Sequence, residues 1–240
     1  NKNKKSKGIL FMHDINKIDN ELSELDKEKE IISFILSNGI SKEKSKIITE
    51  RLYYKFYNLH NIVNVSEKEL IKIKGLGAKK SKLLKIIPKL LEYYLLGGLK
   101  LSASHFKKKD LTDYLIVKLG KLKFETFSII CLDINKRFIS MEQIFRGTID
   151  SATIYPRDLV EKSLSAGASY VIIVHNHPSG ISNPSKEDLE ITHALFKAFL
   201  TVNIKMMDHL IVAGNSVYSF RDNGIFDNYN LNNSLDNIKI

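Results

Sequence analysis

Two histidines two residues apart, followed by a serine and an aspartate, are the residues of this chain best suited to chemistry. His175 and His177 come directly after the apolar run 170–174, which predicts that they lie at the end of a strand. Residues two apart in an extended chain point to the same face, so both imidazoles can bind one ion. Ser185 and Asp188 complete the pattern His-x-His-x7-Ser-x2-Asp. Two imidazoles and one carboxylate leave a fourth tetrahedral position for water, which is typical of catalytic rather than structural zinc.

Ser185 and Asp188 also fit a purely structural role. Serine followed three residues later by an acidic residue is a helix-capping arrangement, in which both side chains bind the first amides of a helix. The sequence predicts that such a helix begins at Lys186. The two interpretations are compatible, because a fixed helix start would also hold Asp188 in place.

The elements that must position these residues make up the back half of the chain. There, β-branched and apolar residues gather in short runs divided by turns, and amphipathic segments separate them. We expect strands at 126–132, 138–145, 170–174, 210–213 and 217–220, and helices at 113–119, 156–165 and 186–200. The pattern predicts an α/β (α+β) domain on a mixed sheet with antiparallel hairpins.

The front half is predicted to be a small all-α domain. Apolar residues recur at three- and four-residue steps from Leu22, Ser41 and Ser66 can cap helices, and residues 59–65 are interpreted as a connection. A last helix is expected from Lys79 to Tyr94 with a kink at Pro88, and Gly97-Gly98 is expected to end the all-helical part. The expected organisation is a tail at 1–20, a helical domain at 21–98, a linker at 99–112, a metal-binding domain at 113–226 and a tail at 227–240.

Charge and composition narrow the class of protein. Residues 1–110 carry 24 lysines and arginines against 13 acidic residues, whereas 111–240 carry 13 against 14, so the basicity belongs to the front half. Such asymmetry indicates a module that faces a polyanion, although lysine bias across a proteome is an alternative explanation of the total. The single cysteine, Cys131, excludes an internal disulfide and a cysteine-rich zinc site. No apolar run approaches the roughly 20 residues that span a bilayer, so we expect a cytoplasmic protein with no membrane partner.

The segment His175-Asn176-His177-Pro178-Ser179-Gly180, with Pro184-Ser185 and Asp188, resembles the JAMM (MPN+) metallopeptidase signature in the form seen in the RadC family. The segments 145–150, 155–157 and 208–212 look like RadC-type sequence as well, and the resemblance covers roughly residues 22–224. It implies a JAMM/MPN domain of the cytidine-deaminase-like mixed-sheet type, preceded by a helix-hairpin-helix domain.

The resemblance also implies roles for individual residues. His175, His177 and Asp188 would bind Zn²⁺, and Ser185 would donate a hydrogen bond to the developing oxyanion. An upstream glutamate would take a proton from the water, whose pKa zinc lowers toward about 7. Glu125, at the head of an early strand, matches the family's placement and is preferred over Glu142, although either glutamate could simply face solvent.

The helix-hairpin-helix would be centred on Gly75-Leu76-Gly77. Glycines let the backbone approach a phosphate, and nearby lysines, among them Lys79, Lys80 and Lys82, would neutralise neighbouring phosphates on a solvated face. These features predict DNA-backbone binding without sequence preference. A glycine turn with a solvated lysine face, or a protein-contact module, is the alternative.

The function expected from the whole sequence is a zinc-dependent hydrolase of peptide or isopeptide bonds that carries a DNA-binding module. Two rival interpretations stay open: a DNA-binding accessory protein of repair or recombination with a non-catalytic metal site, and a metal-dependent nuclease. Asp208 and His209 could form a pair that orients a metal ligand, but a satisfied core histidine is an equal alternative.

Overall fold

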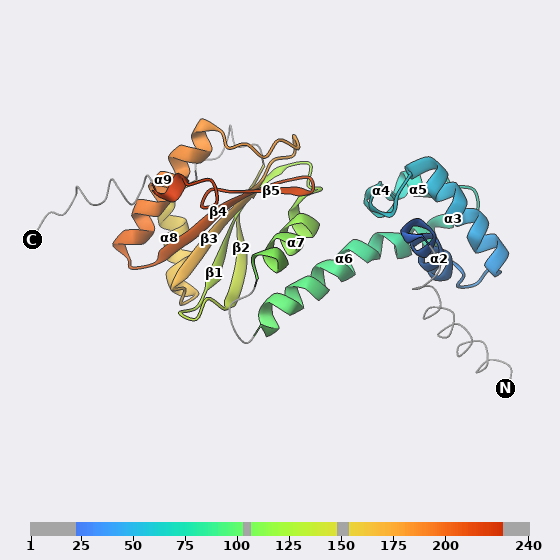
Figure 1. The fold of residues 1–240 in the computed structure, drawn as a ribbon, viewed down its shortest axis with the longest axis horizontal. Helices are drawn as coiled ribbons and strands as arrows, with labels where there is room; N and C mark the ends of the chain where they lie inside the picture. The colour runs from blue at the N-terminus through green and yellow to red at the C-terminus, as the bar shows by residue number, and fades with distance from the viewer. Residues whose placement is uncertain (1–22, 103–106, 148–153, 228–240) are drawn as a thin grey trace, which may run out of the picture. The chain divides into compact units, whose positions relative to one another are not determined.

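The computed structural model describes residues 23–102, 107–147 and 154–227, and the chain divides into two compact units, residues 1–90 and 91–240 (Figure 1). The predicted tails lie outside the described residues, apart from Asp227. The first unit contains helices α2 (Glu24–Leu36), α3 (Lys42–Phe56), α4 (Leu59–Asn64), α5 (Glu67–Ile71) and most of α6 (Gly77–Leu101). The second contains the end of α6, helices α7 (Lys108–Leu119), α8 (Pro156–Ser165) and α9 (Lys186–Thr201), and strands β1 (Glu125–Leu132), β2 (Phe138–Gly147), β3 (Tyr170–Asn176), β4 (Lys205–Ala213) and β5 (Ser216–Ser219). Of the helices in the described segments, none is long and apolar enough to cross a membrane.

The helical unit packs its apolar stripes into one core, with Leu36, Leu52, Ile62 and Leu84 fully buried. As predicted, Ser41 and Ser66 cap helices: each side chain accepts a hydrogen bond from a backbone N–H of the first turn. The interpretation of residues 59–65 as a connection is wrong, because α4 forms there. The side chain of Asn58 caps α4 by accepting from the Asn61 N–H.

A tight turn joins α5 to α6, as expected of a helix-hairpin-helix. Gly75 and Gly77 both have positive φ, +94° and +65°, and a Cβ on Gly75 would lie 3.3 Å from the side chain of Ile48. The guanidinium of Arg51 donates to the Lys74 carbonyl at 2.8 Å and ties the turn to α3. Any other residue would be strained at Gly75, because this position needs both the positive φ and the room beside Ile48.

The expectation that Lys80 lies on a solvated face is wrong. Its ammonium group donates to the carbonyls of Leu36 and Asn38, at 2.8 and 2.7 Å, and so satisfies the C-terminal end of α2. Lys85, one turn further along α6, does the same for the end of α4 through the carbonyls of Val63 and Val65. Lysines on this face of α6 therefore hold the helical unit together.

Replacing Lys80 with methionine is expected to destabilise the end of α2, because two carbonyls lose a charged donor while the apolar stem is kept. Hydrogen bonds to charged groups are worth about 1.5–3 kcal/mol, which corresponds to about 10- to 150-fold faster amide exchange. Hydrogen–deuterium exchange of residues 31–40 measures this, with Lys79→Met at an exposed neighbouring position as the matched control. Equal exchange in the two variants would show that the capping contacts contribute no stability.

The predicted stop at Gly97-Gly98 is also wrong, since α6 continues to Leu101. Two glycines cost a helix about 1 kcal/mol each relative to alanine, but Leu99 is buried against α7 and the sheet, and this packing outweighs the cost. Helix α7 in turn begins at Lys108 rather than at 113, inside the segment interpreted as a linker. Its lysine-rich start concealed the apolar face formed by Leu111, Tyr114 and Leu115.

The second unit is built on a five-stranded mixed sheet with the order β2-β1-β3-β4-β5. Only the β3–β4 pair is parallel, and α9 makes the connection between these two strands. The pairs β1–β2, β1–β3 and β4–β5 are antiparallel. This arrangement confirms the predicted fold class, a mixed sheet with antiparallel hairpins.

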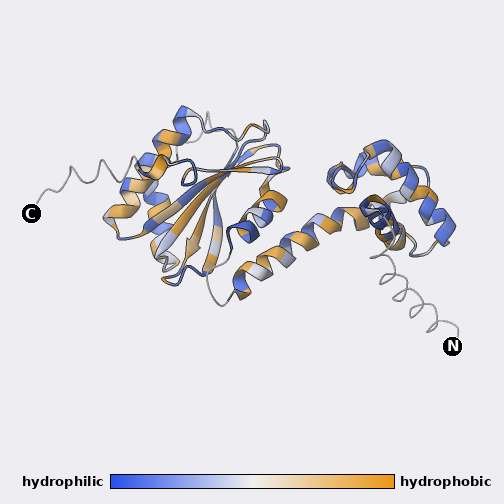
Figure 2. Cartoon of the chain, viewed as in Figure 1, coloured by the Kyte–Doolittle hydropathy of each residue, from blue (hydrophilic) through white to orange (hydrophobic). Residues whose placement is uncertain are grey.

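Helices cover both faces of this sheet. Leu159 of α8 and Leu195 and Phe199 of α9 pack on one face, and α7 with the end of α6 packs on the other. The central strands are correspondingly apolar along most of their length (Figure 2). Cys131 is buried in β1 as a small apolar residue, as predicted.

Candidate metal centre

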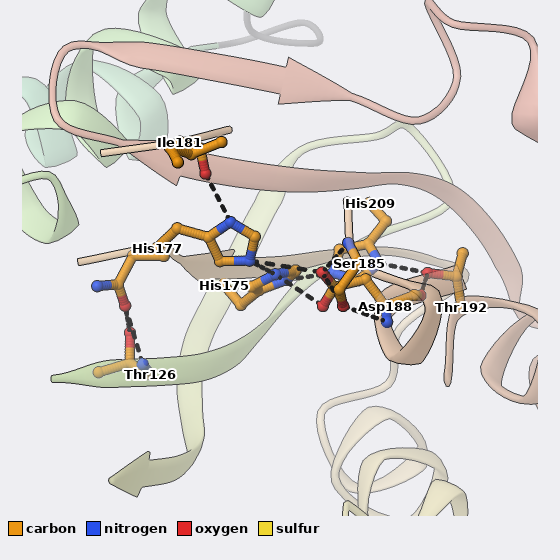
Figure 3. A network of polar contacts seen from close by, with 9 residues as sticks. Thr126, His175, His177, Ile181, Ser185, Asp188, Thr192 and His209 are labelled. Carbon is orange, nitrogen blue, oxygen red and sulfur yellow. Dashed lines mark hydrogen bonds and ion pairs between the residues drawn. The ribbon is translucent and has the colours of Figure 1, made fainter. Parts of the chain in front are cut away.

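The two histidines of the His-x-His motif lie at the end of β3, and their rings point to one place (Figure 3). His175 is fully buried in the strand, and its Nε2 atom lies 2.9 Å from Nε2 of His177. The backbone N–H of His177 donates to Val212 of β4 at 2.9 Å, which extends the sheet past the strand end. The sheet therefore fixes both backbones, and the period of two brings the imidazoles together, as the sequence predicts.

Asp188 reaches the same place from the first turn of α9. Its Oδ1 atom lies 3.0 Å from Nε2 of His175, and its Oδ2 atom lies 3.4 Å from Nε2 of His177. Ser185 and Asp188 also form the predicted capping box, in which each side chain accepts from the other residue's backbone N–H, at 3.0 and 2.8 Å. The Ser185 hydroxyl in addition donates to Oδ2 at 2.7 Å, so the cap holds the carboxylate in a single orientation.

These three side chains could bind a metal ion. One ligand atom from each of His175, His177 and Asp188 lies within 4.8 Å of the others. Nδ1 of His177 faces the carbonyl of Ile181 at 2.8 Å, and because a carbonyl only accepts, this nitrogen carries the ring proton. In the neutral ring Nε2 then has a lone pair directed at the Asp188 carboxylate, and either a second proton or a metal ion between the two would make this contact favourable. The donor set therefore fits a divalent ion with a preference for nitrogen and oxygen ligands.

The carboxylate and the imidazoles of this cluster shift each other's pKa values. The Asp188 carboxylate, through its hydrogen bond, raises the pKa of His177 above its ordinary value, and the nearby Glu125 carboxylate adds to this. Burial acts most strongly on Asp188 and by itself would raise its pKa, but the interactions of the carboxylate with the rings of His175 and His177 together bring that pKa well below its usual range. A proton on His177 and a metal ion thus compete for one site.

His209, in β4, continues the cluster into the core. Its Nε2 atom lies 2.8 Å from Nδ1 of His175, and its Nδ1 atom lies 2.6 Å from the Thr192 hydroxyl of α9. The ring is fully buried, and burial lowers the pKa of His209 well below its ordinary value. His209 is therefore the satisfied core histidine that one of the two interpretations expected, and it also contacts a metal-ligand candidate.

Asp208 takes no part in this cluster, although it precedes His209. Adjacent residues of a strand point to opposite faces, and the Asp208 carboxylate instead accepts from the Ser219 hydroxyl at 2.5 Å and from the Arg221 N–H at 3.0 Å. Burial raises its pKa. The expected Asp208–His209 pair is therefore divided, because Asp208 holds the turn after β5.

Glu125 is the first residue of β1 and lies beside the metal-ligand candidates. Phe127 pairs with His175 across the antiparallel strands, so Glu125, two residues earlier, faces the same side as His175 and His177. Glu142 lies on β2, which β1 separates from β3, and its carboxylate is bound by Lys162 of α8 at 3.0 Å. Of the two glutamates considered, the register brings only Glu125 to the metal-ligand end of β3.

Asn176 and Thr126 are site residues that the sequence did not reveal. Asn176 lies between the two histidines in sequence, and its buried side chain points to the opposite face of the sheet. It accepts hydrogen bonds from the N–H and the hydroxyl of Thr126 at 2.8 and 2.7 Å. It also donates to the Phe124 carbonyl at 3.1 Å. These bonds flank Glu125 on both sides and tie the start of β1 to the end of β3. A polar residue at a buried strand position was the available signal.

Comparison with known proteins agrees with this geometry. The sequence model of the RadC-like JAB domain matches residues 106–225, which includes every residue of the cluster. The UPF0758 protein of Janthinobacterium sp. (strain Marseille) is 32% identical over 197 residues, covering 82% of this chain and 88% of its own length. The UPF0758 protein of Pseudoalteromonas translucida is 34% identical over 198 residues, with the same two coverages.

The family model covers the sheet that carries the cluster, and the relatives align over 82% of the chain. They agree with the resemblance carried by the His-x-His and Ser-x-x-Asp residues, and with a mixed sheet that has helices on both faces. The chain therefore belongs to the RadC-like JAB domain family.

Proposed function

We propose that the second unit is a zinc-dependent hydrolase of peptide or isopeptide bonds. The observation that carries this proposal is the convergence of His175, His177 and Asp188 at the end of β3, with Glu125 on the same face of the neighbouring strand. Three ligands leave a coordination position for water, which is the arrangement of catalytic zinc sites.

Each residue of the site has its own role in the proposed reaction. His175, His177 and Asp188 would hold Zn²⁺, which when bound acts as a Lewis acid and makes water a nucleophile near neutral pH. Glu125 accepts the proton of the attacking water and transfers it to the leaving amine. Ser185 first orients Asp188, and its hydroxyl must turn from Oδ2 toward the substrate to donate to a developing oxyanion.

The test is hydrolysis by the full chain after dialysis against zinc. A library of internally quenched peptides and a peptide joined through a lysine side chain represent the proposed substrates, and a fluorescent single- and double-stranded DNA set represents phosphodiesters. Cleavage of an amide bond that a chelator abolishes supports the proposal. Cleavage of DNA alone favours the nuclease, and zinc binding without any cleavage favours an accessory protein with a non-catalytic site.

A second proposal concerns the helical unit, which we infer binds duplex DNA through its backbone without reading sequence. The glycine turn before α6 places Lys74, Lys79 and Lys82 on exposed positions around the start of this helix. Lysines near a helix N-terminus and a close-approaching glycine backbone suit phosphates. Lys80 and Lys85 are excluded from this surface because they cap α2 and α4.

Replacing Lys74, Lys79 and Lys82 together with glutamine is expected to flatten the salt dependence of DNA binding. Each phosphate contact contributes about −0.9 to the slope of log K against log salt, so three lysines account for up to about 2.7 units. Fluorescence anisotropy of the full chain on a labelled duplex measures the slope. The charge-matched control replaces Lys121, Lys186 and Lys197, which are exposed on the second unit. Equal slopes in the two triple variants would remove the support for this surface.

A further inference from the structure

We propose that His209 is a positioning residue of the metal centre, which forces His175 to present its Nε2 lone pair to the ion. This inference rests on the proposed zinc site. It follows from the donors and acceptors along one chain of hydrogen bonds, from Thr192 through His209 to His175 (Figure 3).

The chain of hydrogen bonds starts at Thr192, one helical turn after Asp188. The Thr192 hydroxyl donates its only proton to the backbone carbonyl of Asp188, since a carbonyl accepts and never donates. The hydroxyl oxygen can therefore only accept from Nδ1 of His209, which lies 2.6 Å away. Nδ1 thus carries the proton of the neutral His209 ring, and Nε2 of that ring is an acceptor.

The direction of this chain decides the tautomer of His175. Nε2 of His209 accepts from Nδ1 of His175 at 2.8 Å, so the proton of His175 lies on Nδ1. The Nε2 lone pair of His175 then points to Asp188 Oδ1 and His177 Nε2, at 3.0 and 2.9 Å. Metal-bound histidines commonly donate their second N–H to an acceptor that fixes the tautomer. Here that acceptor is a second imidazole, itself set by a threonine on the helix that carries the third ligand.

The surroundings of His209 prevent its ring from turning to another arrangement. It stacks on Phe220 with ring centroids 4.7 Å apart, and it meets the edge of Phe127 at 5.6 Å. Phe127 also stacks on His175 at 5.8 Å. The two histidines are fully buried, so no water competes for their nitrogen atoms. Packing and hydrogen bonds therefore both hold the metal-facing nitrogen in place.

The experiment compares His209→Phe with His209→Gln. Phenylalanine fills the aromatic site but cannot accept from His175, whereas glutamine offers a carbonyl to His175 and an amide to Thr192. We expect the zinc dissociation constant to rise about 10- to 100-fold in His209→Phe and to stay near wild type in His209→Gln. Competition with a chromophoric chelator measures the affinity, and the visible spectrum of the Co²⁺-loaded protein reports the ligand geometry. A merely structural role would change thermal unfolding in both variants and leave the spectrum of the loaded protein unchanged.

A second pair of variants keeps the test decisive if His209→Phe does not fold. Thr192→Val removes the hydroxyl that accepts from His209 and so fixes the direction of the hydrogen bonds, whereas Thr192→Ser keeps it. Weaker zinc binding in the valine variant alone supports the inference. Wild-type affinity and Co²⁺ spectrum in folded His209→Phe, or in Thr192→Val, would overturn the inference while leaving the zinc site intact. Wild-type protein that binds no zinc would overturn the metal centre itself. Tight zinc binding without hydrolysis would overturn only the proposed function.

Discussion

Replacing His177 with alanine is expected to remove zinc from the purified protein, which should otherwise contain close to one zinc per chain. Only two of the three proposed ligands remain, His175 and Asp188. Four-ligand zinc sites bind with about 10–16 kcal/mol, or about 2.5–4 kcal/mol per ligand, so the dissociation constant should rise by about two to three orders of magnitude. Elemental analysis after dialysis measures the content.

His60→Ala is the matched control for this experiment, because His60 is exposed in the helical unit and far from the cluster in sequence. It should keep the full zinc content. Asp188→Asn is a further variant, since it preserves the size of the side chain while it removes the charged ligand. Full zinc occupancy in His177→Ala would be incompatible with the proposed metal centre.

Replacing Glu125 with glutamine is expected to leave zinc binding unchanged and to lower kcat/KM for amide hydrolysis by about 10²- to 10⁴-fold. General acid–base catalysis contributes this amount, and an amide cannot accept the proton of the attacking water. The three ligands are untouched by the substitution. The measurement pairs zinc content with hydrolysis of the best substrate found in the peptide and isopeptide set.

Glu142→Gln is the contrasting variant. Glu142 lies on the edge strand β2, and its carboxylate is held by Lys162 of α8. Activity should therefore stay within a few-fold of wild type. Loss of activity in Glu142→Gln with retention in Glu125→Gln would assign the proton transfer to the other glutamate. It would also mean that the sheet register does not describe the active arrangement.

The sequence by itself determined the mixed α/β fold class, the helical front half and the metal-ligand candidates. These depend on local rules. Spacing of two in a strand places His175 and His177 on one face, and a serine before a helix followed three residues later by Asp188 forms a capping box. The rules need only neighbouring residues, so no knowledge of the folded chain was required.

The tertiary structure alone decided the features that depend on contacts between distant segments. Strand register brought Glu125, 50 residues before His175, to the metal-ligand face, and placed Glu142 beside Lys162. Packing carried α6 through Gly97-Gly98, against their intrinsic helix preference. Lys80 reached the end of α2 across more than 40 residues, and His209 met His175 only through the β3–β4 pairing. Local sequence cannot specify such partners, because burial and hydrogen bonding between segments are set only when the whole core forms.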